Sequence, residues 1–219
     1  MTIKFRQQPA SVSATFQQGF GRIADQQRLL GGTAAATIAA RRVGEVALPV
    51  YSCDPQSLAP DREPSLTAVG WRYLIVEAHE IVETADILGG TGLAGGETPR
   101  FRGTRSGGLV VPQLGRALVV AEQHLGNTSL DFEMRLLECL PIQTVAVWLH
   151  CTTVGMGSDN DMFVIVAGPT SLGAPGDVRA AGPFWLTLGR VSRDVIQAHK
   201  ALGGGGTPSS SGSSSSGTP

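Results

Sequence analysis

The stretch of sequence that decides the fold is LDFEMRLLECLPIQTVAVWLHC, residues 130–151. From Leu130 to Leu136 apolar residues alternate with charged ones, which is the pattern of a half-buried β-strand with one face in water. Residues 142–151 are apolar on both faces near their middle, which is typical of a central strand. Pro141 has no N–H to donate, so the ladder is expected to be interrupted or bent there.

Three more segments on either side of this stretch predict strands: residues 46–51, 66–78 and 162–167. The last of them follows the polar loop 155–161 and is the expected hairpin partner of the central strand. Residues 79–88 either extend the preceding strand or turn helical.

The strand predicted at residues 66–78 places four large side chains on one face at period two: Val69, Trp71, Tyr73 and Ile75. We expect Trp71 and Tyr73 to anchor the core. Arg72 lies on the opposite face, where it must find a charged partner or a sheet edge, because a buried unpaired cation is costly.

An amphipathic helix is predicted at residues 13–30, since apolar residues recur there at helical spacing: Phe16, Phe20, Ile23 and Leu30. Gly19 and Gly21 inside it each cost about 0.5 to 1 kcal/mol relative to Ala. This apolar stripe either packs on its own domain or docks a partner. Residues 33–43 are Ala-rich and predict a second short helix.

Two further helices are predicted in the second half of the chain. Pro112 suits the first turn of a helix that ends at Gly126 and carries one apolar face, made of Leu114, Leu118, Ala121 and Leu125. Residues 184–202 also fit a helical face, and Ser192 is a candidate start of a separate helix within them.

The strands come in groups, with helices between or after them, and this order predicts an α+β fold. We expect a single domain with a mostly antiparallel sheet packed by two or three helices. Residues 1–45 form an N-terminal arm with helical potential, and residues 46–202 form the globular domain. Residues 203–219 contain only Gly, Ser, Thr and Pro and are expected to be a disordered tail, because they bury nothing that offsets the entropy of ordering.

The charge balance of the chain, with 17 basic and 18 acidic side chains, argues against a nucleic-acid partner, because no global field would attract a polyanion. The apolar runs are far shorter than the roughly 20 residues of a membrane span. We find no secretory signal pattern. Three cysteines without disulfide-scaffold spacing, Cys53, Cys139 and Cys151, fit free thiols in a reducing compartment, so a cytoplasmic protein is expected.

Several short motifs resemble functional ones but are incomplete. Residues 90–95 match G-x-G-x-x-G without the helix that should follow, and His79 begins an H-E-x-x-H pattern whose second histidine is Glu83. Residues 159–161 are Asp-Asn-Asp, and such side chains are favoured in turns, so we predict a turn there and not a metal site. We therefore predict no catalytic residue, no cofactor and no metal site.

Residues 89–108 contain eight glycines and predict a long loop with a basic cluster made of Arg100, Phe101, Arg102 and Arg105. Three arginines around an aromatic ring could hold an anion, a nucleic acid or an acidic partner. A solvated loop is the simpler interpretation.

The leading hypothesis for function is a non-enzymatic protein-interaction or structural assembly subunit, which forms a homo-oligomer or docks another protein through the N-terminal arm. Its interaction residues would be those of the apolar stripe (Phe16, Phe20, Ile23 and Leu30), together with the basic cluster. A second hypothesis is a small hydrolase that uses Cys53 or Cys151 with His79, His124 or His150, and it predicts a thiolate of lowered pKa. Anion or nucleic-acid binding by the basic cluster is the third.

Overall fold

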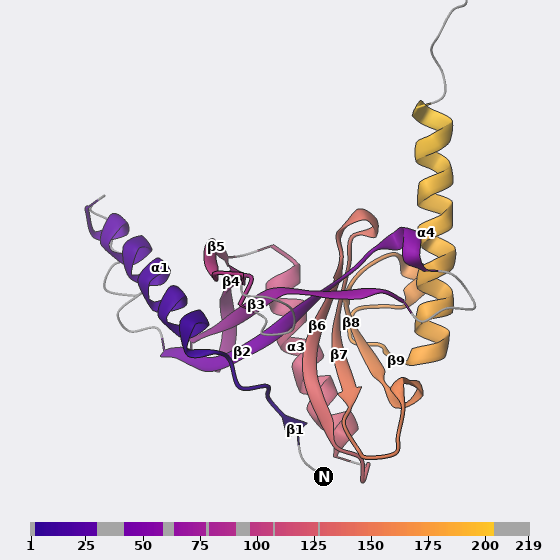
Figure 1. Ribbon diagram of the computed structural model, residues 1–219, viewed down its shortest axis with the longest axis horizontal. Coiled ribbons are helices and arrows are strands. Elements are labelled where there is room, and N and C mark those ends of the chain that lie inside the picture. The colour runs from indigo at the N-terminus through magenta and orange to yellow at the C-terminus, as the bar shows by residue number, and fades with distance from the viewer. Residues whose placement is uncertain are drawn as a thin grey trace, which may run out of the picture.

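The computed structural model describes residues 3–29, 42–58, 64–77, 79–90, 97–106, 108–126 and 128–203. These residues form a single α+β domain, in which nine strands make one mostly antiparallel sheet and three α-helices pack on its two faces (Figure 1). The predicted fold class is confirmed. Gly203 ends the last helix, and residues 204–219 of the predicted tail lie outside the described residues.

The strands are β1 (Ile3–Lys4), β2 (Arg42–Cys53), β3 (Leu66–Glu77), β4 (Glu80–Leu88), β5 (Arg100–Ser106), β6 (Phe132–Cys139), β7 (Thr144–Cys151), β8 (Met162–Ala167) and β9 (Val178–Ala180). Their order in the sheet is β5-β4-β3-β2-β6-β7-β8-β9, and β1 also pairs with β6. The predicted central strand is β7, which lies between β6 and its hairpin partner β8, as the sequence indicated.

Strand β6 has two parallel partners along one edge. Its start pairs with β1, at Ile3↔Phe132 and Lys4↔Glu133, and its end pairs with β2, from Val50↔Leu136 to Ser52↔Glu138. In the described part of the chain, residues 47–49 of β2 therefore pair with β3 alone. The sheet consists of two antiparallel halves, joined by the three β2–β6 pairs, which we call the joint.

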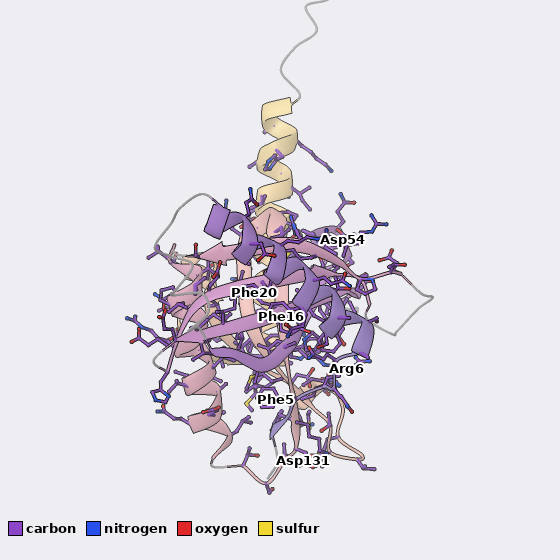
Figure 2. The ribbon with its side chains drawn as sticks, turned by 90° about the vertical axis from the view of Figure 1, so that its left-hand side faces the viewer. Phe5, Arg6, Phe16, Phe20, Asp54 and Asp131 are labelled. Atoms are coloured by element: carbon purple, nitrogen blue, oxygen red, sulfur yellow. The ribbon has the colours of Figure 1, made fainter. Side chains whose placement is uncertain are left out.

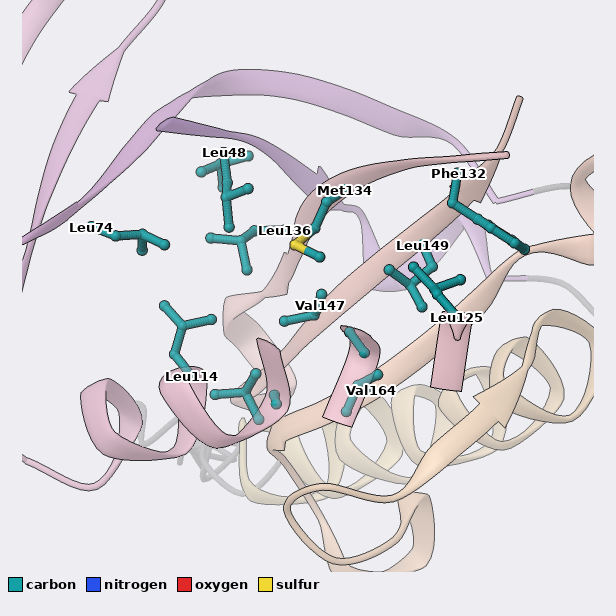
Figure 3. Packing of buried hydrophobic residues seen from close by; sticks show 14 of the residues in the cluster. Leu48, Leu74, Leu114, Leu125, Phe132, Met134, Leu136, Val147, Leu149 and Val164 are labelled. Atoms are coloured by element: carbon teal, nitrogen blue, oxygen red, sulfur yellow. The ribbon is translucent and has the colours of Figure 1, made fainter. Parts of the chain in front are cut away.

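One face of the sheet is covered by α3 (Val110–Leu125), and the other by α1 (Ala10–Leu29) and α4 (Ala181–Gly203). Figure 1 shows α1 over the β2–β3–β4 half and α4 over the other end of the sheet. Under α3, Leu114 faces Leu74 while Leu125 lies beside Phe132 and Leu149, so this helix spans both halves (Figure 3).

The predicted loop at residues 89–108 is wrong in its second half, because Arg100–Ser106 forms the edge strand β5. The outer edge of β4 supplies the hydrogen-bond partners for this segment. Gly103, with φ 139°, stands at a register shift between the two strands. This shift breaks the alternation of side chains between the two faces, so the sequence pattern does not indicate a strand.

The single apolar face predicted for residues 66–78 is interrupted by a bulge. Trp71, Tyr73 and Ile75 face α1, but Val69 packs into the cluster under α3. Pairing shifts from Val50↔Gly70 to Tyr51↔Ala68, so Val69 is the extra residue and the alternation reverses there.

The remaining helices and strands differ from expectation mainly at their ends. The last helix is continuous through Ser192, whose buried hydroxyl donates to the Pro55 carbonyl at 2.8 Å. Strand β2 begins at Arg42, inside the predicted arm, since β3 is long enough to pair with it there. The short helix predicted at residues 33–43 lies outside the described residues, except for Arg42 and Val43, which belong to β2.

Candidate interaction site beneath the N-terminal arm

The N-terminal arm, which we define from here on as residues 3–29, docks on the sheet at two places. At its start β1 extends the edge of β6, and the Lys4 ammonium donates to Asp131 at 3.1 Å. In helix α1, the Phe16 ring stacks on Tyr73 with centroids 3.9 Å apart and planes 9° from parallel. Figure 2 shows α1 lying across the sheet with Phe16 and Phe20 along it and Phe5 and Arg6 just before it.

Gly19 gives the helix its closest approach to the sheet. A Cβ atom at this position would overlap the ring of Phe101, so only glycine lets that ring reach the helix backbone. Phe101 comes from the edge strand β5, and thus the arm contacts the outermost strand of its half of the sheet. Glycine inside a helix is destabilising relative to Ala, and the contact with Phe101 offsets this cost.

A cavity of about 630 Å³ lies where the arm meets β2 and β3. It is lined by Phe5, Arg6, Gln7, Gln8, Ser13, Phe16, Gln17, Val46, Ala47 and Tyr73. Its size falls within the roughly 300 to 1,000 Å³ of small-molecule sites. Val46 and Ala47 belong to the part of β2 that has separated from β6, so the divergence of the two strands makes room for it.

Two of the lining residues carry a buried polar atom that has no hydrogen-bond partner among the described residues: Tyr73 Oη and Gln8 Oε1. Burial raises the pKa of Tyr73 to about 12, and the nearby Ser13 hydroxyl opposes the rise without reaching hydrogen-bond geometry. Leaving such a group unsatisfied costs about 1 to 3 kcal/mol.

Arg6 connects the cavity to an aromatic row on the same face of the sheet. Its guanidinium donates to the Tyr51 hydroxyl at 3.3 Å. The Arg135 guanidinium lies 5.0 Å from the Tyr51 ring centre and 4.7 Å from that of Trp148, and it donates to Glu133 at 2.7 Å. These cation–π contacts hold Arg135 between two rings.

The aromatic row ends at Asp161, which is 3% exposed. One of its oxygens accepts from Trp148 Nε1 at 2.7 Å and lies 3.1 Å from His150 Nδ1, and the other accepts from the Cys151 amide at 2.8 Å. The carboxylate is thus fully used in holding the start of β8 to β7.

Arg72 has charged partners, as expected for a buried cation. Its Nε donates to Asp86 at 2.7 Å and its Nη1 donates to Glu138 at 2.7 Å, while the exposed Arg105 approaches Asp86 at 3.0 Å. Burial alone would lower the pKa of Arg72, but the two carboxylates outweigh it and raise the pKa, so the guanidinium stays charged. The bond to Glu138 crosses the joint between the halves of the sheet.

The predicted interaction residues fall into two groups. Phe16 is buried, Phe20 and Ile23 are half-buried on α1, and Leu30 lies outside the described residues. The basic cluster is spread along β5, where Arg100 and Arg102 are exposed, Phe101 packs against the arm and Arg105 pairs with Asp86. The sequence suggested that the three arginines share one loop, but they lie along a strand instead.

The predicted Cys and His candidates lie in different environments. Cys53 is hydrogen-bonded to Cys139, and this bond together with burial raises the pKa of the Cys53 thiol well above its usual range. Cys151 packs under α3, on the opposite face of β7 from His150. His79 and His124 are exposed. The hydrolase hypothesis remains a prediction that rapid alkylation of a native thiol would test.

Sequence reasoning missed the cavity. It identified Tyr73 and Phe16 but treated them as a core anchor and a possible docking residue, and Arg6 and Gln8 carried no motif. Among the described residues, no cluster of three or more His, Cys, Asp or Glu side chains is arranged to hold a metal ion. Their helices also include none that is both long and apolar enough to cross a membrane.

Comparison with known proteins adds no relative to this picture. No protein-family model matches the chain, and neither the curated proteins nor the solved structures contain a significant match to it.

Proposed function

We propose that this chain is a non-enzymatic assembly subunit whose copies associate by exchanging their N-terminal arms. The observation that carries the proposal is the way the arm docks. It adds a two-residue strand to an edge of β6, and its helix packs Val12, Phe16 and Gly19 on the face of a sheet whose other strands pair without it. An end element held in this way can dock on a second copy through the same contacts.

The length of the connection supports exchange. Residues 30–41 separate the arm from β2, and a stretch of this length spans up to roughly 40 Å when extended. The arm makes the same contacts on its own chain as on a second copy. Any favourable free energy of exchange therefore comes from new contacts between the copies, and it is opposed mainly by the entropy lost on association.

An engineered disulfide tests which copy supplies the arm. The overlap of a Gly19 Cβ with the Phe101 ring brings these two positions within disulfide reach, and the native cysteines Cys53, Cys139 and Cys151 are buried. We expect the double variant Gly19→Cys, Phe101→Cys to form a covalent dimer on a non-reducing gel after oxidation. Light scattering of the unmodified chain should give twice its mass.

The single variant Phe101→Cys is the matched control, because it carries one of the two new thiols, keeps Gly19 and so adds no side chain against the helix, and it should remain monomeric on the gel. An intrachain bond in the double variant, together with a monomeric mass in solution, would overturn arm exchange. Deleting the arm is a poorer test, since it uncovers Trp71, Tyr73, Ile75 and Ile87 and promotes aggregation by itself.

A further inference from the structure

We propose that Cys53 and Cys139 are a peroxide-sensitive pair, which forms a reversible intrachain disulfide and locks the joint between the two halves of the sheet. Cys53 ends β2 and Cys139 ends β6, so the two cysteines lie directly beyond the last β2–β6 pair, Ser52↔Glu138. The inference does not rest on arm exchange, because both cysteines belong to the core cluster under α4 and not to the one under the arm.

The geometry of the two strands suits a disulfide. Tyr51 and Leu137 are paired across the joint, and Cys53 and Cys139 each follow by two residues. Because side chains alternate along a strand, both sulfurs lie on the same face of the sheet, where both cysteines pack in the cluster under α4. Neighbouring strands lie about 4.8 Å apart, within the range of roughly 4.4 to 6.8 Å between the Cα atoms of disulfide-bonded cysteines.

The two side chains are already in contact. Cys139 Sγ lies 3.4 Å from the carbonyl oxygen of Cys53, and the two thiols are hydrogen-bonded to each other. The third cysteine, Cys151, packs on the other face of the sheet, under α3. A bond between Cys53 and Cys139 therefore needs little change in the backbone, and Cys151 is not positioned to compete for it.

Both thiols are buried, with 2% of Cys53 and 0% of Cys139 exposed, but each lies next to an exposed turn. Cys53 is followed by the exposed Asp54, and Cys139 is followed by Leu140, which is 58% exposed. Local opening of such a turn uncovers a strand end without unfolding the sheet. Hydrogen peroxide is little larger than water, so a small opening is wide enough for it.

The two thiols differ in a way that assigns the first step. Hydrogen bonds from the Cys53 thiol and from the Ile142 amide lower the pKa of Cys139, whereas the contact with Cys139 and burial raise the pKa of Cys53. The Cys139 thiolate therefore attacks hydrogen peroxide, which forms a sulfenic acid and releases hydroxide.

The second step closes the disulfide. The Cys53 sulfur attacks the Cys139 sulfur, the S–O bond of the sulfenic acid breaks, and its hydroxyl leaves as water with the Cys53 proton. In total the two thiols lose two electrons and two protons, and one peroxide is reduced to two waters. A dithiol such as dithiothreitol reverses the reaction by thiol–disulfide exchange.

The test treats the unmodified, folded chain with hydrogen peroxide, unfolds it without reductant and alkylates the remaining thiols before mass spectrometry. We expect one of the three cysteines, Cys151, to be alkylated, and a digest of the monomer to contain Cys53 linked to Cys139. Dithiothreitol should restore alkylation of all three. Alkylation of all three after peroxide, a bond to Cys151, or sulfinic acid in place of the disulfide would each overturn the proposal.

Three variants test the order of the steps. In Cys53→Ala the sulfenic acid has no partner thiol, so dimedone added as the chain is unfolded should trap it at Cys139. Cys139→Ala should give no adduct at Cys53. Cys151→Ala is the matched control and should form the disulfide as the unmodified chain does. An adduct at Cys53 and none at Cys139 would overturn the assigned order.

A lock at the joint also has a kinetic signature. The bond joins residues 86 positions apart and holds together two halves of the sheet that separate on unfolding. We expect the oxidised chain to unfold in urea at least about tenfold more slowly than the reduced chain, because the cross-link restricts the opened states. Peroxide should leave the unfolding rate of Cys53→Ala unchanged. Equal rates for the oxidised and reduced chains would show that the bond does not lock the joint.

Discussion

Tyr73 has its ring stacked on Phe16 and its hydroxyl buried, so ionising the phenol would place a negative charge away from water. This is why burial raises the pKa of Tyr73 to about 12, above the value of about 10 that a tyrosine has in an unfolded chain. The folded state therefore binds the phenol proton more tightly than the unfolded state does. Stability from this source is complete below pH 10 and is lost as the pH rises toward 12.

The pH dependence gives a direct check of the buried phenol. Between pH 10 and 12 we expect the free energy of unfolding to fall faster in the unmodified chain than in Tyr73→Phe, by at most about 1.4 kcal/mol per pH unit for one proton. Urea unfolding at a series of pH values measures the difference. Other groups that titrate in this range, including Cys53, are common to both proteins and cancel. Parallel curves would show that the phenol ionises equally easily in the folded and unfolded states.

Arg72 is the second residue whose burial has an energetic consequence. Its guanidinium and the carboxylates of Asp86 and Glu138 are each less than 10% exposed at the side chain. Removing the cation would leave two buried carboxylates short of a partner, and breaking a buried pair in this way costs about 3 to 5 kcal/mol.

We expect Arg72→Met to lower the free energy of unfolding by about that amount, measured by urea or thermal denaturation. Arg105→Met is the matched control, because Arg105 contacts the same Asp86 from an exposed position, and it should cost no more than about 1 kcal/mol. The triple variant Arg72→Met, Asp86→Leu, Glu138→Leu should regain most of the loss. A smaller effect for Arg72→Met than for Arg105→Met would mean that the buried network contributes little.

At the scale of helices and strands, the sequence predicts best where period and burial agree. The α3 helix is predicted from Pro112 to Gly126 and found at Val110–Leu125, since its apolar face meets the sheet along its whole length. Strands β6, β7 and β8 were also predicted, because their alternation or continuous apolarity follows directly from having one or two covered faces.

Prediction failed where tertiary contacts override local pattern. Strand β5 consists of three arginines, Phe101, a glycine and two small polar residues, and it is a strand because β4 offers an unpaired edge. The bulge at Val69 depends on the register in which β3 pairs with β2, and this register cannot be read from the sequence of either strand alone. The cavity could not be predicted for the same reason, since it joins residues near positions 5, 46 and 73, and sequence spacing carries no information on their proximity.

For the whole molecule, the decisive feature is that the two halves of the sheet meet at the joint, a short parallel pairing between β2 and β6. The other neighbouring strands in the sheet order are antiparallel, and each of those pairs joins two strands that are consecutive in the chain. Arg72 and α3 also span the halves, and both need the halves to be in place before they can make their contacts.

The joint has a consequence for the order of folding. The segments it brings together are more than 80 residues apart, so the loop-closure entropy must be lost before the pairing is gained. Hairpins such as β6–β7 close a short loop and are expected to form in the transition state, with the joint following it. In stopped-flow experiments Val147→Ala, inside the hairpin, should mainly slow folding, whereas Val50→Ala, at the joint, should mainly speed unfolding. The opposite result would place the meeting of the two halves in the folding nucleus.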